Sequence, residues 1–218
     1  MGFFRPDPWR MFEKRDMHGV AKAMTHKDVK VRRGATACFK SRTIKEIDKD
    51  ELKVVIHPLI ERLRDPDKAV RGYATQALAH IHLLHGLVNK TATSDIVQLL
   101  FDPDAEIRAD VVYGLGEIFT NPIVVSAESK PCPEKGSENV VFPIIEKLKD
   151  SDDRVKEAAA VTLGSLGYEE AVMPLIELLH KSGNKTVTKA TIQSLNMINP
   201  DWKDISAIKS TERRKKRK

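Results

Sequence analysis

The stretch PDKAVRGYATQALAHI, residues 66–81, decides the fold of this chain. It begins with a proline and an aspartate, residues that commonly precede and cap a helix. The helical sequence that follows has few large apolar residues and carries alanine at Ala74, Ala77 and Ala79. Small side chains let the backbone of a neighbouring helix come close, so this helix is predicted to pack against others like it.

The same pattern occurs five times along the chain. Each copy is anchored by a polar residue before the helix, and a Val or Ile stands three positions after that anchor. Positions 3, 7, 10, 11 and 14 after the anchor trace one helical face, which is mostly small in its middle. The anchors are Asp28, Asp67, Asp104, Asp152 and Asn184.

A second helical segment precedes each anchored helix. Three of these segments share a proline followed by Leu or Ile at helical spacing: HPLIERLRDPD (57–67), FPIIEKLKDSD (142–152) and MPLIELLHKSGN (173–184). Because proline suits the first helical turn, each of these helices is predicted to carry its proline in the first turn. The two segments of one copy make a helical hairpin, and stacked hairpins bury a continuous core that one hairpin cannot form.

These copies resemble the HEAT repeats, in particular the short HEAT-like type of many archaeal and bacterial proteins, over residues 16–198. The resemblance implies an all-α fold, an armadillo-type α-α superhelix or solenoid of about five antiparallel helix pairs. It also implies that the anchored helices line the concave side and that the protein holds other macromolecules. We expect one HEAT-like domain over residues 1–208, with an N-terminal cap at 1–16 and an inserted loop at 121–139.

The net charge of +6 comes from the C-terminal tail. Of the 37 Lys and Arg residues, seven lie in residues 209–218 beside one acid, Glu212, which leaves 30 basic and 30 acidic side chains in residues 1–208. Like charges repel, and this tail has no apolar residue to bury, so we expect it to be disordered. The neutral body does not have the charge of a nucleic-acid-binding surface.

Cysteine usage and hydropathy indicate the compartment. Cys38 lies within a helical pattern and Cys132 within a loop, and the sequence has no CxxC motif, which fits a reducing environment. We find no targeting segment and no apolar run long enough for a membrane span. We therefore expect a cytoplasmic protein, or a nuclear one if the host has a nucleus.

The sequence predicts no enzyme, no cofactor and no metal site. Some proteins with similar repeats are enzymes, and one class of metal-dependent hydroxylases uses His-Glu pairs, but this sequence has no His-Glu dipeptide. His80, His82 and His85 are spaced so that a helix points them to different sides, which favours a structural role over metal binding. The glycines of GLGEIF and GSLGYEE match neither a dinucleotide fingerprint nor a nucleophile elbow.

A basic residue recurs four positions after the anchor, at Arg32, Arg71, Arg108 and Lys156. One interpretation is a basic stripe for phosphates. The other is that the aspartates cap the helices and form a ladder of ion pairs with these residues between neighbouring repeats. We favour the ladder, which resembles the one known in HEAT proteins, because it explains the recurrence without any ligand.

Three departures from the repeat pattern are candidate functional regions. The N-terminal stretch carries Phe3, Phe4, Trp9 and Phe12, which we expect to cap the first repeat rather than to dock a partner. The 121–139 loop is either disordered or used for binding. The third is the concave face at positions 5, 9 and 13 after the anchors, with partner-binding candidates Arg33, Gln76, His80, Tyr113, Glu117, Glu157, Lys189 and Gln193.

These candidates are mixed in charge, whereas a phosphate-binding groove would be dominated by Lys and Arg. We therefore favour a non-catalytic scaffold or adaptor that holds another protein on its concave face, with no small-molecule substrate and no membrane contact. The alternative is a factor associated with nucleic acid or ribonucleoprotein that binds phosphates through the tail. The tail residues concerned are Lys209, Arg213, Arg214, Lys215, Lys216, Arg217 and Lys218.

Overall fold

The computed structural model describes residues 6–87, 90–119 and 138–204, and within these ranges all regular secondary structure is helical. The described residues form two compact units, unit 1 and unit 2, which divide after Ile118. Phe3, Phe4, Cys132, most of the predicted 121–139 loop and the 209–218 tail lie outside the described residues. The single domain over residues 1–208 and the disorder of the tail stay predictions.

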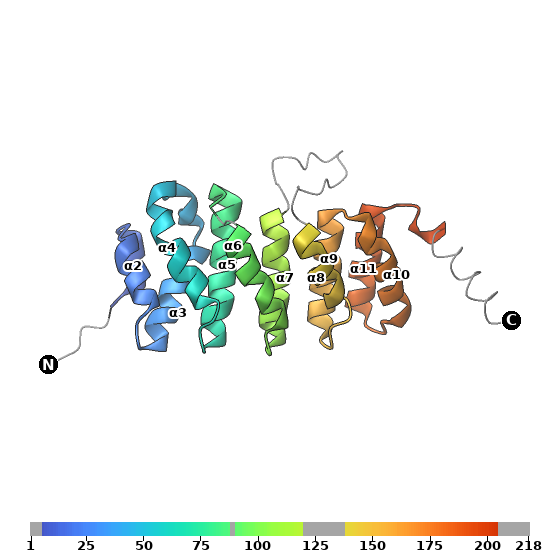
Figure 1. Cartoon of the computed structure of the whole chain (residues 1–218), viewed down its shortest axis with the longest axis horizontal. Coiled ribbons are helices and arrows are strands. Elements are labelled where there is room, and N and C mark those ends of the chain that lie inside the picture. The colour runs from blue at the N-terminus through green and yellow to red at the C-terminus, as the bar shows by residue number, and fades with distance from the viewer. Residues whose placement is uncertain (1–5, 88–89, 120–137, 205–218) are drawn as a thin grey trace. The chain divides into compact units, whose positions relative to one another are not determined.

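Unit 1 consists of helical hairpins stacked side by side, drawn from blue to green in Figure 1. Helices α2 and α3 form one pair and α4 and α5 the next, and α2 packs on α4 while α3 packs on α5. First helices thus stack on first helices, and anchored helices on anchored helices. The α-helices are α1 (Pro8–Glu13), α2 (Met17–Met24), α3 (Val29–Ala37), α4 (Lys49–Arg62), α5 (Lys68–His85), α6 (Lys90–Gln98) and α7 (Ala105–Phe119).

Three short 3-10 segments accompany these helices: η1 (Cys38–Lys40) and η2 (Arg42–Glu46) connect α3 to α4, and η3 (Leu99–Phe101) follows α6. Unit 2 repeats the hairpin arrangement (Figure 1), with α8 packed on α9, α10 on α11, and α9 on α11. Its elements are α8 (Glu138–Lys147), α9 (Asp153–Leu166), the 3-10 segment η4 (Glu169–Ala171), α10 (Val172–Lys181) and α11 (Lys185–Ile198).

The five predicted anchors stand directly before α3, α5, α7, α9 and α11. In each case the side-chain oxygen accepts a hydrogen bond from a backbone N–H of the first turn, for example from Val70 to Asp67 at 3.1 Å and from Thr186 to Asn184 at 2.8 Å. The other three acceptors are Asp28, Asp104 and Asp152. Such a cap stabilises a helix by about 1 kcal/mol. Because a cap occurs at each of the five anchors, the repeat register predicted from sequence is confirmed at every copy.

The small residues on the buried face are needed for close helix packing. Gly164 of α9 and Ser194 of α11 are buried, and a Cβ atom added to Gly164 would lie 2.6 Å from the Ser194 Oγ and 2.8 Å from its Cα. Ala74 on α5 and Ala159 on α9, both seven residues after an anchor, are fully buried. Larger side chains at these positions would force the anchored helices apart.

The prolines of the first helices do not all begin a helix. Pro174 lies in the first turn of α10, whereas Pro58 and Pro143 lie inside α4 and α8. The prediction of a proline in the first turn was therefore wrong for α4 and α8. In α4, Asp48 caps the helix ten residues before Pro58, accepting from the Asp50 N–H at 2.7 Å. The capped first turn thus lets α4 begin upstream of Pro58, a residue that cannot donate a backbone hydrogen bond.

The first repeat is covered by α1. Phe12 of α1 is 4% exposed, and its ring meets that of Phe39 edge-on with the centroids 5.3 Å apart. Pro8 is also buried and faces Gly34, where an added Cβ would lie 3.4 Å from the proline ring. Trp9 is 45% exposed and takes no part in this core, because its neighbours Pro8 and Phe12 occupy the buried side of this short helix.

Candidate functional site

The exposed side of the anchored helices of unit 1 carries a cluster of polar and aromatic side chains. These side chains stand 5, 6, 9 or 13 positions after an anchor, away from the buried positions 3, 7, 10, 11 and 14. We call this surface the second-helix face. It comprises Arg33 of α3, Tyr73, Gln76 and His80 of α5, and Asp110, Tyr113 and Glu117 of α7.

Arg33 joins the first repeat to the second. Its guanidinium donates to both carboxylate oxygens of Asp67, with Nε–Oδ1 at 2.9 Å and Nη2–Oδ2 at 2.5 Å. This hydrogen bond holds the pKa of Asp67 below its usual range. Because Arg33 is 47% exposed, its outer side can still meet a partner. The predicted partner-binding residue therefore also belongs to the contacts between repeats.

Gln76 and His80 are likewise tied to neighbouring repeats. The Gln76 amide donates to Asp110 Oδ2 at 2.9 Å, and His80 Nδ1 lies 2.9 Å from the carbonyl oxygen of Phe39. Burial raises the pKa of Asp110, and the hydrogen bond from Gln76 offsets part of that effect. This part of the face is therefore pre-organised and carries a carboxylate that has lost part of its hydration.

Glu117 and the two tyrosines complete the face. Partial desolvation raises the pKa of Glu117, and nearby His80 acts in the opposite direction. Tyr113 is 43% exposed, and the Lys40 ammonium lies 5.0 Å from the centre of the Tyr73 ring. The second-helix face thus combines half-buried Asp110 and exposed Glu117, both with a raised pKa, with two aromatic rings.

In unit 2 the predicted candidates lie on α9 and α11. Lys189 and Gln193 are exposed, and Glu157 is half-buried. The prediction omitted two apolar residues at positions 9 and 13 of these helices: Val161 is 37% exposed and Met197 is 40% exposed. Their spacing from the anchors was the available signal, since it is the same spacing that identified Gln193 and His80. Whether any of these residues binds a partner stays a prediction.

Arg32 and Arg71 form the predicted ion pairs between repeats, but not with the anchors, whereas Lys156 pairs with Asp153 of its own helix. Arg32 donates to both oxygens of Asp65, with Nε–Oδ2 at 2.8 Å and Nη2–Oδ1 at 3.1 Å, and Arg71 does the same to Asp102 at 2.7 and 3.1 Å. The acceptor is therefore the aspartate two residues before the next anchor. Both arginine side chains are at most 14% exposed, so this part of the row is not an open stripe for phosphates.

Two of the clustered histidines, His80 and His85, contact backbone carbonyl oxygens. His80 contacts the Phe39 carbonyl, as above, and His85 Nε2 lies 3.3 Å from the carbonyl oxygen of Ile44. Both bonds connect α5 to the chain that leaves α3. The nearby thiol of Cys38 is buried, which raises its pKa to about 12 and keeps it protonated near neutral pH.

Two further observations apply to the described ranges only. Within residues 6–87, 90–119 and 138–204, no three His, Cys, Asp or Glu side chains gather in a way that could hold a metal ion. In the same part of the chain, no helix is both long enough and apolar enough to cross a bilayer.

Comparison with known proteins identifies the repeat family. A family model for HEAT repeats matches residues 56–127 and 132–199, which together make up more than half of the chain, and a model for the HEAT-like repeat matches residues 29–81. The chain belongs to the HEAT-repeat family. No curated protein matches this HEAT-repeat chain in sequence.

Solved structures of low sequence identity share the fold. An engineered protein of the Northeast Structural Genomics Consortium aligns with a TM-score of 0.61 at 19% identity, over 90% of this chain and 85% of that one. A designed armadillo repeat protein in complex with peptide (KR)4 aligns with a TM-score of 0.59 at 19% identity, over 88% and 85%.

A natural protein complex is similar as well. The structure of the complex of CpcE and CpcF of phycocyanin lyase from Nostoc sp. PCC7120 contains a chain that aligns with a TM-score of 0.59 at 16% identity. The alignment covers 87% of this chain and 68% of that one. At these identities the likeness establishes the fold, an all-α solenoid of the HEAT and armadillo type, as the sequence predicted.

Proposed function

We propose that this HEAT-repeat protein is a non-catalytic scaffold that holds an extended segment of a partner protein against the second-helix face of unit 1. The observation that carries the proposal is the pairing of partly desolvated carboxylates with an exposed aromatic ring. Asp110 and Glu117 supply the carboxylates, and Tyr113, 43% exposed, supplies a ring beside them on α7. The ladder and the hydrogen bonds between repeats hold these groups in fixed positions before a partner arrives.

The charges on this face favour a partner segment that carries Lys or Arg. Burial disfavours the ionised forms of Asp110 and Glu117, and an opposite charge brought close to them would relieve that penalty. The tyrosine ring offers a cation–π contact to the same side chain. A phosphate group would instead require accessible arginines, and Arg32 and Arg71 are already occupied by Asp65 and Asp102.

The structural comparison supports this proposal by analogy. The designed armadillo repeat protein with the same type of fold is in complex with peptide (KR)4. A basic peptide is therefore a ligand that such a scaffold accommodates, although at 19% identity the likeness itself extends to the fold and not to individual residues.

A labelled peptide tests the proposal. We expect an alternating Lys-Arg octapeptide to bind the purified chain in fluorescence anisotropy, and the double variant Asp110→Asn, Glu117→Gln to bind it at least about tenfold more weakly, since each lost charge contact is worth roughly 1 kcal/mol or more. The control is Asp50→Asn, Glu61→Gln, which removes one Asp and one Glu from exposed positions on α4. Equal losses in both variants would contradict the assignment to the second-helix face.

A further inference from the structure

The junctions of unit 1 share one arrangement of an arginine and an aspartate. Arg71 reaches across to Asp102 with two hydrogen bonds, and its Nη1 also donates to the carbonyl oxygens of Asp65 and Pro66 at 3.0 and 3.2 Å. Asp102 Oδ1 in turn accepts from the N–H of the anchor Asp104 at 2.9 Å. The aspartate thus caps the turn before the next helix and neutralises the arginine.

The junction between α9 and α11 in unit 2 departs from this arrangement. Lys156 stands four residues after its anchor, where unit 1 has arginine, and Ser182 stands two residues before the next anchor, where unit 1 has aspartate. The Ser182 Oγ still accepts from the N–H of Asn184 at 3.3 Å, so the turn keeps its cap. The carboxylate of the ladder is missing here, and Lys156 Nζ lies 2.5 Å from Asp153 of its own helix.

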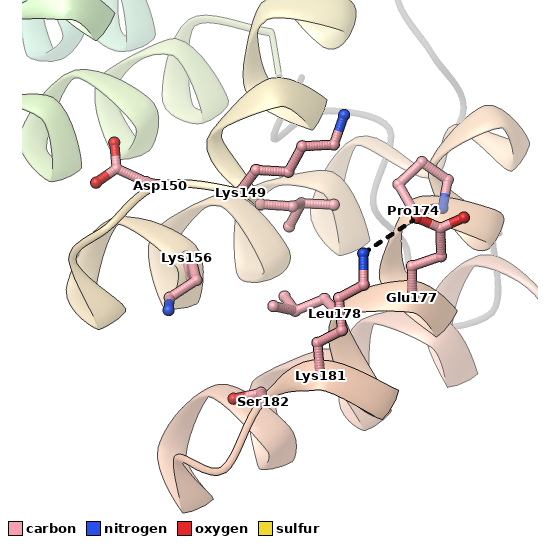
Figure 2. Close-up of a pocket in the computed structure, with 9 residues that line it drawn as sticks. Lys149, Asp150, Lys156, Pro174, Glu177, Leu178, Lys181 and Ser182 are labelled. Carbon is pink, nitrogen blue, oxygen red and sulfur yellow. Dashed lines mark ion pairs between the residues drawn. The ribbon is translucent and has the colours of Figure 1, made fainter.

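A cavity of about 280 Å³ lies at this altered junction (Figure 2). Its polar lining includes Ser182 and three lysines, which come from three segments: Lys149 from the connection after α8, Lys156 from α9 and Lys181 from α10. Leu148, Pro174 and Leu178 give it an apolar wall. The volume suits one or two side chains rather than a drug-sized ligand.

Acidic neighbours of Lys149 and Lys181 do not close the site. Lys149 lies 3.3 Å from Glu146, and Lys181 lies 3.9 Å from Glu177, which also lines the cavity (Figure 2). Both lysines are more than 60% exposed, and ion pairs at such positions contribute only about 0–1 kcal/mol, so a ligand can replace them at little cost. Asp150, the remaining acid of the lining, marks one side of the cavity (Figure 2).

We propose that this cavity binds the carboxylate of an acidic residue in a peptide segment, which replaces the ladder aspartate that unit 2 lacks. The carboxylate lies between Lys156 and Lys181 near the Ser182 hydroxyl and shares the Lys156 ammonium with Asp153. An aliphatic neighbour in the peptide packs on Leu148 and Leu178. The site is on a different unit from the second-helix face and does not rest on the function proposed for that face.

Methyl NMR of Leu148 and Leu178 tests the inference. The probe is the acetylated, amidated tripeptide Leu-Glu-Leu, and the matched peptide is Leu-Gln-Leu. We expect saturable shifts of both leucines with a dissociation constant near millimolar for the acidic peptide, and at least about tenfold weaker binding of the amide peptide, as for a charge-assisted contact. Equal binding of the two peptides, or no shift with either, would overturn the proposal.

One substitution separates the missing carboxylate from general charge effects. Ser182→Asp places a carboxylate at the position that corresponds to Asp102 and retains an acceptor for the Asn184 N–H, so the variant is expected to fold. It should bind the acidic peptide at least about tenfold more weakly. Lys203→Gln lowers the net charge by the same amount at an exposed position and should leave binding unchanged. Unchanged binding in Ser182→Asp would overturn the proposal, as would a response of the leucines to inorganic phosphate equal to that with the acidic peptide.

Discussion

Arg71 and Asp102 form a bidentate pair across the junction between the second and third repeats, with Nε–Oδ2 at 2.7 Å and Nη2–Oδ1 at 3.1 Å. The side chains are 14% and 4% exposed, so both charges are largely withdrawn from water. Removing one member of such a pair leaves the other buried without its partner. The loss is then larger than that of an ion pair at the surface.

We expect Arg71→Ala to lower the free energy of unfolding by about 3 kcal/mol, as for a buried pair that loses one partner. Urea unfolding of Arg71→Ala, Asp102→Ala and the double variant gives the coupling energy of the pair. Arg33→Ala is the matched control, because Arg33 makes the same bidentate contact with Asp67 but is 47% exposed, and only a small loss is expected there. If Arg71→Ala and Arg33→Ala lower the free energy of unfolding equally, burial does not determine how much each ion pair contributes to stability.

The repeat register predicts how the chain tolerates larger side chains. Ala74 is fully buried seven residues after its anchor, so Ala74→Leu should overpack the interface between repeats and cost roughly 1–3 kcal/mol. Ala37 lies nine residues after its anchor and is half-buried, so the same substitution there should cost less. Thermal unfolding measures both, and equal losses would show that the assignment of the two faces is wrong.

Asp110 and Asp104 should affect the pH dependence of stability in opposite directions. Burial raises the pKa of Asp110 in the folded state above the unfolded value of about 3.9. As the pH rises from the unfolded pKa through the folded pKa, the unfolded state ionises first, so the stability of the folded state falls. Asp110→Asn should remove this loss. The Lys68 contact lowers the pKa of Asp104, which therefore adds stability above the unfolded pKa and loses it as the pH falls through the lower, folded pKa.

Urea unfolding between about pH 3 and pH 7 measures both effects. Relative to the native chain, Asp110→Asn should gain stability with rising pH, and Asp104→Asn should lose it. Asparagine caps a helix as well as aspartate does, so the second variant removes a charge and keeps the cap of α7. Curves of the same sign for the two variants would contradict the assigned environments.

The basic tail is the basis of the alternative function and lies outside the described residues. We expect any affinity of the chain for generic duplex DNA to be lost when residues 209–218 are removed, because residues 1–208 are neutral. Seven phosphate contacts at about 0.9 each correspond to a slope of roughly 6 in log affinity against log salt. If the truncated chain binds DNA as well as the whole chain does, the described surface must carry the phosphate contacts.

The regular features of the fold were predictable because they recur. The caps at Asp67 and Asn184 and the burial of Val70 follow from a fixed spacing within one helix. The partner of Arg71 was not identified, since Asp102 lies 31 residues away and becomes adjacent only when two hairpins stack. The four-residue spacing in the sequence had instead paired Arg71 with its own anchor, Asp67.

The functional features depend on packing that spacing does not reveal. The raised pKa of Asp110 results from burial beside α5, and no pattern within α7 indicates it. The replacement of the ladder pair by Lys156 and Ser182 was visible in the sequence. The cavity at this junction was not visible, because it depends on the conformation of Lys156, whose ammonium lies beside Asp153 of its own helix.

The most direct test of the proposed function is site-specific photo-crosslinking in cells that naturally contain the protein. A benzophenone side chain replaces Tyr113 on the second-helix face in one variant, and in the other it replaces Phe142, an exposed aromatic residue of α8. We predict one predominant protein adduct from position 113, lost when Asp110→Asn and Glu117→Gln are added, and no such adduct from position 142. The same adduct from position 142 and none from position 113 would contradict the proposal that the second-helix face of unit 1 holds the partner.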